Sequence, residues 1–121
     1  MDDKLKERLI KRLQKIPKSE SLENRKIALE KDLEKKIVTK AKQLGFLSYK
    51  FVSPSNRGVP DRIFISKTGK VFFIEFKSAK GKLTKLQEKK ISELTTNKAD
   101  VFVVNSEELG LEILTKIMSE G

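Results

Sequence analysis

The segment over residues 71–77, VFFIEFK, constrains the fold more than any other part of the sequence. In a strand, Phe72 and Phe73 point to opposite faces, so both faces carry bulky apolar side chains. This pattern is typical of a central strand in a sheet that is covered on both sides. Glu75 and Lys77 share one face of this strand, where burial is costly unless they are paired or bind a metal. The simpler alternative is a cross-strand ion pair near a sheet edge.

Hydrophobic periodicity predicts the other elements. An amphipathic helix is expected over residues 4–16, ended by Pro17, and residues 18–21 are expected to form a linker. Ser21 is a suitable N-cap for a second helix that runs to Leu44 and stops at Gly45. Further strands are predicted over 46–52, 61–66 and 101–105, and further helices over 84–97 and 106–118.

This order of elements predicts an α/β fold. The first three strands can form an antiparallel meander, and the fourth returns through a helical crossover and can lie parallel to a neighbour. We therefore expect a mixed four-stranded central sheet flanked by helices, with an extra N-terminal amphipathic helix. Residues 1–20 are assigned to that helix and its linker, and residues 21–121 to the main domain.

The charge is strongly positive and unevenly distributed. Lys and Arg number 27 and Asp and Glu 17, a net charge of +10, and the sums are +6 over residues 1–45, +8 over 46–90 and −4 over 91–121. A field of this sign attracts polyanions, with nucleic acid as the first candidate and an anionic membrane surface as the second. A lysine-rich surface that serves only solubility is the third interpretation.

The chain contains neither His nor Cys, so any acids, bases and metal ligands must be carboxylates, lysines, hydroxyls, amides or backbone groups. It has no apolar run of about 20 residues that could span a bilayer. Its first residues have no apolar stretch of the kind found in secretory signals. We therefore expect an intracellular protein without a membrane partner.

The turn between the second and third predicted strands decides whether two carboxylates meet. A three-residue loop over 67–69, with Gly69 at positive φ, places Asp61 opposite Glu75. A two-residue turn would instead put these side chains on opposite faces. We predict the three-residue loop, so that Asp61 and Glu75 lie close enough to share one cation.

Three further polar residues fall on apolar faces. Glu30 and Glu34 lie within the apolar arc of the second helix. We expect Glu30, near the helix start, to reach solvent and Glu34 to point toward the core or a cleft. Gln87 either closes a capping box with Thr84 or faces inward beside Ile91, and both interpretations stay open.

Two adjacent carboxylates, joined by Glu34, would make a hard oxygen site suited to Mg²⁺ or Mn²⁺. Lys77 beside them could orient or deprotonate a water and balance phosphate charge. Such a set suits hydrolysis of a phosphodiester.

A set of motifs over about residues 30–106 resembles the VRR-NUC family, the virus-type replication-repair nuclease domain of the restriction-endonuclease-like superfamily. The motifs are Glu34-x-x-Ile37 ahead of Gly45, Phe51-Val-Ser-Pro-x-x-Arg57-Gly-x-Pro-Asp61-Arg62, Glu75-x-Lys77 and Gly81-x-Leu83-x-x-x-Gln87. The N-terminal helix is not expected in the minimal domain of that family.

The resemblance implies a restriction-endonuclease-like core and a Mg²⁺- or Mn²⁺-dependent DNA endonuclease. Asp61, Glu75 and the Phe76 carbonyl would bind the metal, Lys77 would be the catalytic lysine, and Glu34 and Gln87 would support them. Small members suggest a homodimer that cleaves branched DNA such as Holliday junctions, in the cytoplasm of a bacterial or phage-infected cell.

Basic side chains in the two loops that flank these residues are the candidates for phosphate contacts: Arg57, Lys80, Lys82 and Lys85. Few polar groups remain to read base edges, which favours recognition of DNA shape. The rival interpretations are a non-catalytic nucleic-acid-binding module on the same fold and a basic scaffold protein whose carboxylates are only ion-paired.

Overall fold

The computed structural model describes Lys4 and residues 18–120. The helix predicted over 4–16 lies outside these residues, apart from Lys4. The described elements are α2 (Lys18–Gln43), β1 (Leu47–Lys50), β2 (Arg62–Ile65), β3 (Val71–Phe76), α3 (Lys85–Thr96), β4 (Asp100–Val104) and α4 (Glu107–Glu120).

The four strands form one mixed sheet in the order β1-β2-β3-β4. β1, β2 and β3 pair antiparallel, and β4 lies parallel to β3, as predicted. The turn between β2 and β3 has the predicted three-residue geometry, because the Ser66 N–H donates to the Lys70 carbonyl and Gly69 has a φ of 89°. This register brings Asp61 opposite Glu75, one step beyond the Arg62–Ile74 pair.

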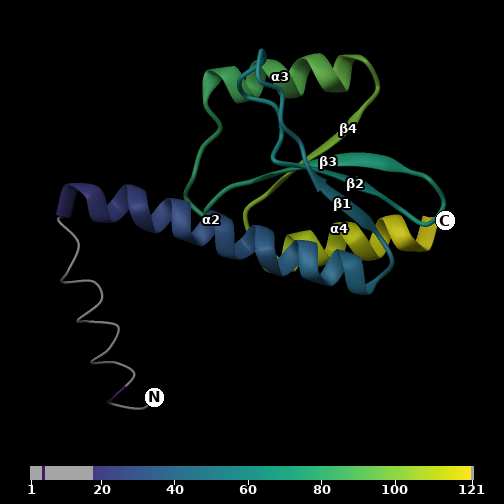
Figure 1. Cartoon of the computed structure of the whole chain (residues 1–121), viewed down its shortest axis with the longest axis horizontal. Coiled ribbons are helices and arrows are strands. Elements are labelled where there is room, and N and C mark those ends of the chain that lie inside the picture. The colour runs from purple at the N-terminus through teal and green to yellow at the C-terminus, as the bar shows by residue number, and fades with distance from the viewer. Residues whose placement is uncertain (1–3, 5–17, 121) are drawn as a thin grey trace.

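The sheet lies between two unequal helical layers. Figure 1 shows α3 on one face and α2 with α4 on the other. The main core fills the space between the sheet and the α2–α4 layer, and its largest members come from the phenylalanine-rich strands, including Phe64, Phe72 and Phe76. The two covered faces explain why β3 is apolar on both sides.

The start of α2 differs from the prediction. The helix begins at Lys18, so residues 18–21 are helical and Ser21 is not its N-cap. The predicted boundary at residue 20 lies within α2, and the division into two parts stays a prediction.

The end of α2 matches the prediction. Gly45 has a φ of 95°, and the Phe46 N–H donates to the Ala41 carbonyl while the Gly45 N–H donates to that of Lys42. These two bonds form a Schellman motif, which needs a residue in the left-handed region. They turn the chain directly from α2 into β1.

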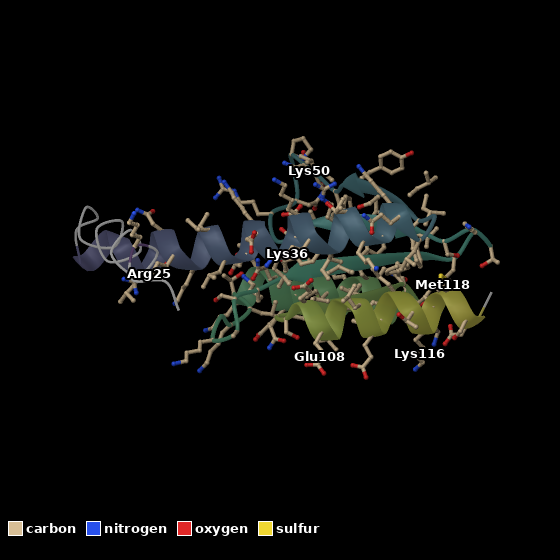
Figure 2. All side chains as sticks on the ribbon, turned by 90° about the horizontal axis from the view of Figure 1, so that it is seen from below. Arg25, Lys36, Lys50, Glu108, Lys116 and Met118 are labelled. Atoms are coloured by element: carbon tan, nitrogen blue, oxygen red, sulfur yellow. The ribbon has the colours of Figure 1, made fainter. Side chains whose placement is uncertain are left out.

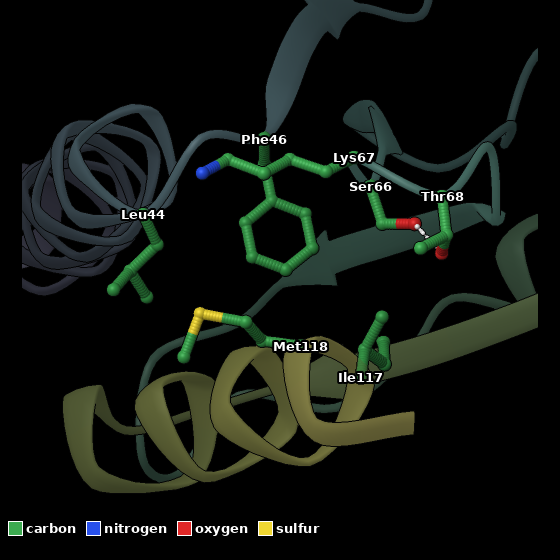
Figure 3. A pocket seen from close by; sticks show the side chains of 7 residues that line it. All are labelled: Leu44, Phe46, Ser66, Lys67, Thr68, Ile117 and Met118. Atoms are coloured by element: carbon green, nitrogen blue, oxygen red, sulfur yellow. Dashed lines mark hydrogen bonds between the residues drawn. The ribbon is translucent and has the colours of Figure 1, made fainter. Parts of the chain in front are cut away.

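A small pocket of about 220 Å³ opens at the end of the sheet where the β2–β3 turn lies. Figure 3 shows the Phe46 ring above Ile117 and Met118 of α4, with Lys67 and the hydrogen-bonded Ser66 and Thr68 beside it. This pocket is at the opposite end of β2 and β3 from Asp61 and Glu75. No helix within Lys4 and residues 18–120 is long and apolar enough to cross a membrane.

Candidate active site

Asp61 completes the hydrogen bonding of the sheet with its side chain. Its Oδ2 accepts a hydrogen bond of 2.8 Å from the Phe76 N–H, and its carbonyl accepts one from the Phe51 N–H. Pro60, directly before it, is buried and has no N–H to contribute. The carboxylate of Asp61 is therefore held in a fixed position at the end of β2.

Glu75 is the buried carboxyl group of the site. Its exposed fraction is 2%, and its neighbours along the strand are apolar. The pKa of Glu75 is raised from 4.5 to about 9, chiefly by burial and further by a hydrogen bond with Asp61 and the charge of Asp61. Two facing carboxyl groups in such a place need a shared proton or a cation between them.

Lys77 follows two residues later, at the end of β3. Its N–H donates to the Val104 carbonyl over 2.9 Å, so the pairing of β3 with β4 fixes its backbone. Its ammonium is near enough to Glu75 to lower the pKa of that carboxyl group, against the larger effect of burial. The Lys77 ammonium therefore lies near the buried carboxyl group, and among the described residues it forms no ion pair with it.

Gln87 both closes a capping box and faces inward, so both interpretations of this residue are confirmed. Its Oε1 accepts a hydrogen bond of 2.9 Å from the Thr84 N–H, and the Thr84 hydroxyl accepts one from the Gln87 N–H, which completes a capping box at the start of α3. Its Nε2 also lies 3.5 Å from Glu75 Oε2. One side chain therefore begins the helix and contacts the buried carboxyl group.

Glu34 is not placed with the other two carboxylates, which corrects the prediction. Its Oε2 lies 2.6 Å from the Nε of Arg62, and the side chains are 20% and 17% exposed. Arg62 pairs with Ile74, whose side chain faces the α2–α4 layer, whereas Asp61 and Glu75 occupy the opposite face. Among the described residues, no three carboxylates gather into a ready-made metal site.

Glu30 is the α2 carboxylate that reaches the site, and the sequence interpretation missed it. Its Oε1 lies 3.4 Å from the Ser78 N–H, and its charge contributes to the raised pKa of Glu75. The error follows from the helix start, because α2 begins at Lys18 and leaves Glu30 well inside the helix. Figure 1 shows that the first turns of α2 extend past the sheet and that the chain after β3 passes close to the helix.

Comparison with known proteins assigns the family. The sequence model of the VRR-NUC domain matches residues 3–108. This chain belongs to the VRR-NUC family. The match is longer than the stretch over 30–106 in which the motifs were found, and it takes in most of the N-terminal segment.

A curated relative and a solved structure agree with this assignment. A protein of Acyrthosiphon pisum secondary endosymbiont phage 1, named "Putative nuclease p44", is 38% identical over 80 residues, which cover 66% of this chain and 86% of the relative. A solved VRR-NUC domain is 25% identical and superimposes with a TM-score of 0.68 over 72% of this chain and 95% of its own. The chain is therefore a nuclease domain with the mixed-sheet VRR-NUC fold.

The loop before Asp61 packs on the start of α3 in this VRR-NUC chain. Gly58 has a φ of 89°, and a Cβ built on it would lie 2.7 Å from the Leu86 carbonyl oxygen. Only glycine permits this approach, which brings the neighbouring Arg57 to the N-terminal end of α3. The four predicted phosphate contacts are all solvent-exposed in the flanking loops and in the first turn of α3: Arg57, Lys80, Lys82 and Lys85.

The site suits a hard divalent cation by its donor chemistry. Asp61 and Glu75 face each other, and the raised pKa of Glu75 shows that the buried pair holds a proton in the place where a cation could be bound. Mg²⁺ is commonly bound through one or two carboxylates, with water and substrate phosphate completing its coordination. Asp61 and Glu75 satisfy this requirement, and Glu30 rather than Glu34 is the third carboxylate in the neighbourhood.

Proposed function

We propose that this chain is a metal-dependent endonuclease that hydrolyses phosphodiester bonds of DNA and prefers branched substrates such as four-way junctions. The observation that carries the proposal is the burial of Glu75 against Asp61 with Lys77 two residues away. Mg²⁺ or Mn²⁺ would be held by Asp61, Glu75 and the carbonyl oxygen of Phe76. When bound, the metal would polarise the phosphoryl oxygen and make an attacking hydroxide available near neutral pH.

The side chains have distinct roles in this proposal. The Lys77 ammonium orients the attacking water and donates to the phosphate as negative charge builds in the transition state. Water adds to phosphorus, one phosphorus–oxygen ester bond breaks, and the leaving oxygen takes up a proton. Gln87 holds the Glu75 carboxylate, and the Phe76 N–H holds that of Asp61.

Two features of the chain favour branched DNA and a homodimer: the exposed cations near the site and the single site in the domain. The exposed cations near the site suit backbone phosphates, which carry no sequence information directly. A domain with one site cuts one strand, so a two-fold homodimer suits the symmetric cleavage of a junction.

The decisive experiment is a cleavage panel of four-way, flap and linear duplex DNA with Mg²⁺, Mn²⁺ or EDTA. Cleavage of branched DNA that stops in EDTA and in Lys77→Ala supports the proposal. Binding without cleavage under either metal would instead identify a non-catalytic DNA-binding module. If the protein neither binds nor cleaves DNA at low salt, the result supports the scaffold interpretation.

A further inference from the structure

A basic pocket lies at the same end of the sheet as the candidate active site, between α2 and the ends of β1 and β2. It has a volume of about 360 Å³. Its lining contains four cationic side chains and one carboxylate, with Val38 and Thr39 completing the wall. The charged members are Lys31, Glu34, Lys35, Lys50 and Arg62.

The carboxylate in this pocket, Glu34, forms an ion pair with Arg62. Glu34 accepts the Nε–H of Arg62 at 2.6 Å, which fixes the guanidinium group in a half-buried position. The three lysines are solvent-exposed and make no ion pair or side-chain hydrogen bond within the described part of the chain. The pocket therefore holds net positive charge around one arginine that is preorganised by its ion pair.

Lys36, on the side of α2 that faces α4, is in a different electrostatic setting. Lys36 lies 3.1 Å from Asp32 and 4.0 Å from Glu107 of α4. Figure 2 shows Lys50 and the α4 residue Glu108 on opposite sides of α2. Acidic side chains thus flank the α4 side of the helix, and the side facing β1 keeps its positive charge exposed.

The pocket and the active site occupy the same end of the sheet on opposite faces. Arg62 follows Asp61 directly, and Lys50 is the partner of Arg62 in the β1–β2 register. Adjacent residues of a strand point to opposite faces, so the pocket faces α2 while Asp61 faces α3. A polyanion lying across this end of the sheet would meet both.

We propose that this pocket is a second phosphate-binding surface, which holds the backbone of a DNA arm on the α2 side of the cleavage site. The inference rests on the proposed function, because it assumes that DNA is the substrate. It adds a contact surface separate from the loops that carry Arg57, Lys80, Lys82 and Lys85. Two basic surfaces on opposite faces of one sheet end suit a substrate whose arms diverge at the cleavage point.

The test is equilibrium binding of a fluorescein-labelled four-way junction in EDTA, measured by anisotropy over a range of salt concentrations. The test variant combines Lys31→Gln, Lys35→Gln and Lys50→Gln. Arg62 stays intact, because its removal would leave Glu34 without its partner. The control combines Lys67→Gln, Lys98→Gln and Lys116→Gln, three exposed lysines away from the pocket that give the same change of net charge.

We expect the pocket variant to lose about tenfold or more in affinity and to lower the slope of log K against log salt by roughly 0.9 for each contact removed. The control should change both quantities much less. Equal salt slopes in the two variants would overturn the inference. So would a selective loss of binding to phosphatidylglycerol vesicles with unchanged DNA affinity, because the pocket would then serve a membrane.

The design separates this inference from the proposed function. Failure of the unmodified protein to bind or cleave any DNA would overturn both. Cleavage by the unmodified protein, together with indistinguishable pocket and control variants, would overturn only the pocket. Thermal unfolding of both variants checks that loss of affinity does not come from loss of the fold.

Discussion

The buried carboxyl group of Glu75 lies against that of Asp61, its partner across the β2–β3 pair, and shares a hydrogen bond with it. The contact joins two segments that a three-residue turn brings into register. Its consequences can be measured without any substrate.

The metal-free protein should become less stable as pH rises. The folded pKa of Glu75 is about 9 and its ordinary value is 4.5, so between these values the folded state binds a proton that the unfolded state has released. The contribution of Glu75 to the free energy of unfolding is then fully present below about pH 4.5 and is lost progressively up to about pH 9. The slope from this group is at most roughly 1.4 kcal/mol per pH unit. Denaturant unfolding in EDTA at several pH values measures the slope.

The Glu75→Gln variant provides the control for that experiment. A neutral amide cannot titrate, so the fall in stability between pH 5 and 9 should flatten. An equally steep fall in the variant would assign the pH dependence to other groups and would mean that Glu75 ionises normally.

Mg²⁺ or Mn²⁺ should stabilise the protein more at high pH than at low pH. A cation competes with the proton held between Asp61 and Glu75, so its binding is easier when protons are scarce. The melting temperature should rise with metal concentration at pH 8.5 and much less at pH 5.5. An identical rise in the Asp61→Asn variant would place the bound metal elsewhere.

Glu30 and Glu34 should have separable roles. Glu30→Gln should lower cleavage with little change in stability, because Glu30 lies next to the Glu75 site. Glu34→Gln should cost roughly 1 kcal/mol of stability, because it weakens a half-buried charged hydrogen bond to Arg62. Single-turnover cleavage and urea unfolding of both variants measure the two effects, and the reverse pattern would return Glu34 to the site.

Gly58→Ala should disturb the site through backbone packing. The new methyl group would meet the Leu86 carbonyl at 2.7 Å, and the residue would have to keep a positive φ. We expect the free energy of unfolding, measured by urea denaturation, to fall by roughly 2 kcal/mol or more, and DNA binding to become weaker. Gly69→Ala is the matched control, since Gly69 has a similar φ and open space around it, and should cost about 1 kcal/mol.

The sequence was sufficient to predict the sheet and the pairing of Asp61 with Glu75. Turn length and the position of Gly69 determined the register, and alternation then placed each side chain. These are local rules, so they could be applied without coordinates. The same is true of the capping box that Thr84 forms with Gln87.

Local rules could not predict which of the two α2 carboxylates, Glu30 or Glu34, lies near Glu75. Both lie within one apolar arc of α2, and the correct answer depends on where that helix starts and how far it extends past the sheet. The partner of Glu34 is Arg62, which lies 28 residues away, and no local pattern reveals that ion pair. The pKa of Glu75 likewise depends on burial, which only the packed structure defines.

The double use of Gln87 links local helix opening to the chemistry of the site. If the first turn of α3 unwinds, the same event releases the amide that contacts Glu75. The rate of amide hydrogen exchange at the start of α3 would therefore report how often Gln87 releases the carboxyl group of Glu75. A ligand that binds this carboxyl group should slow that exchange, although it does not touch the exchanging amides.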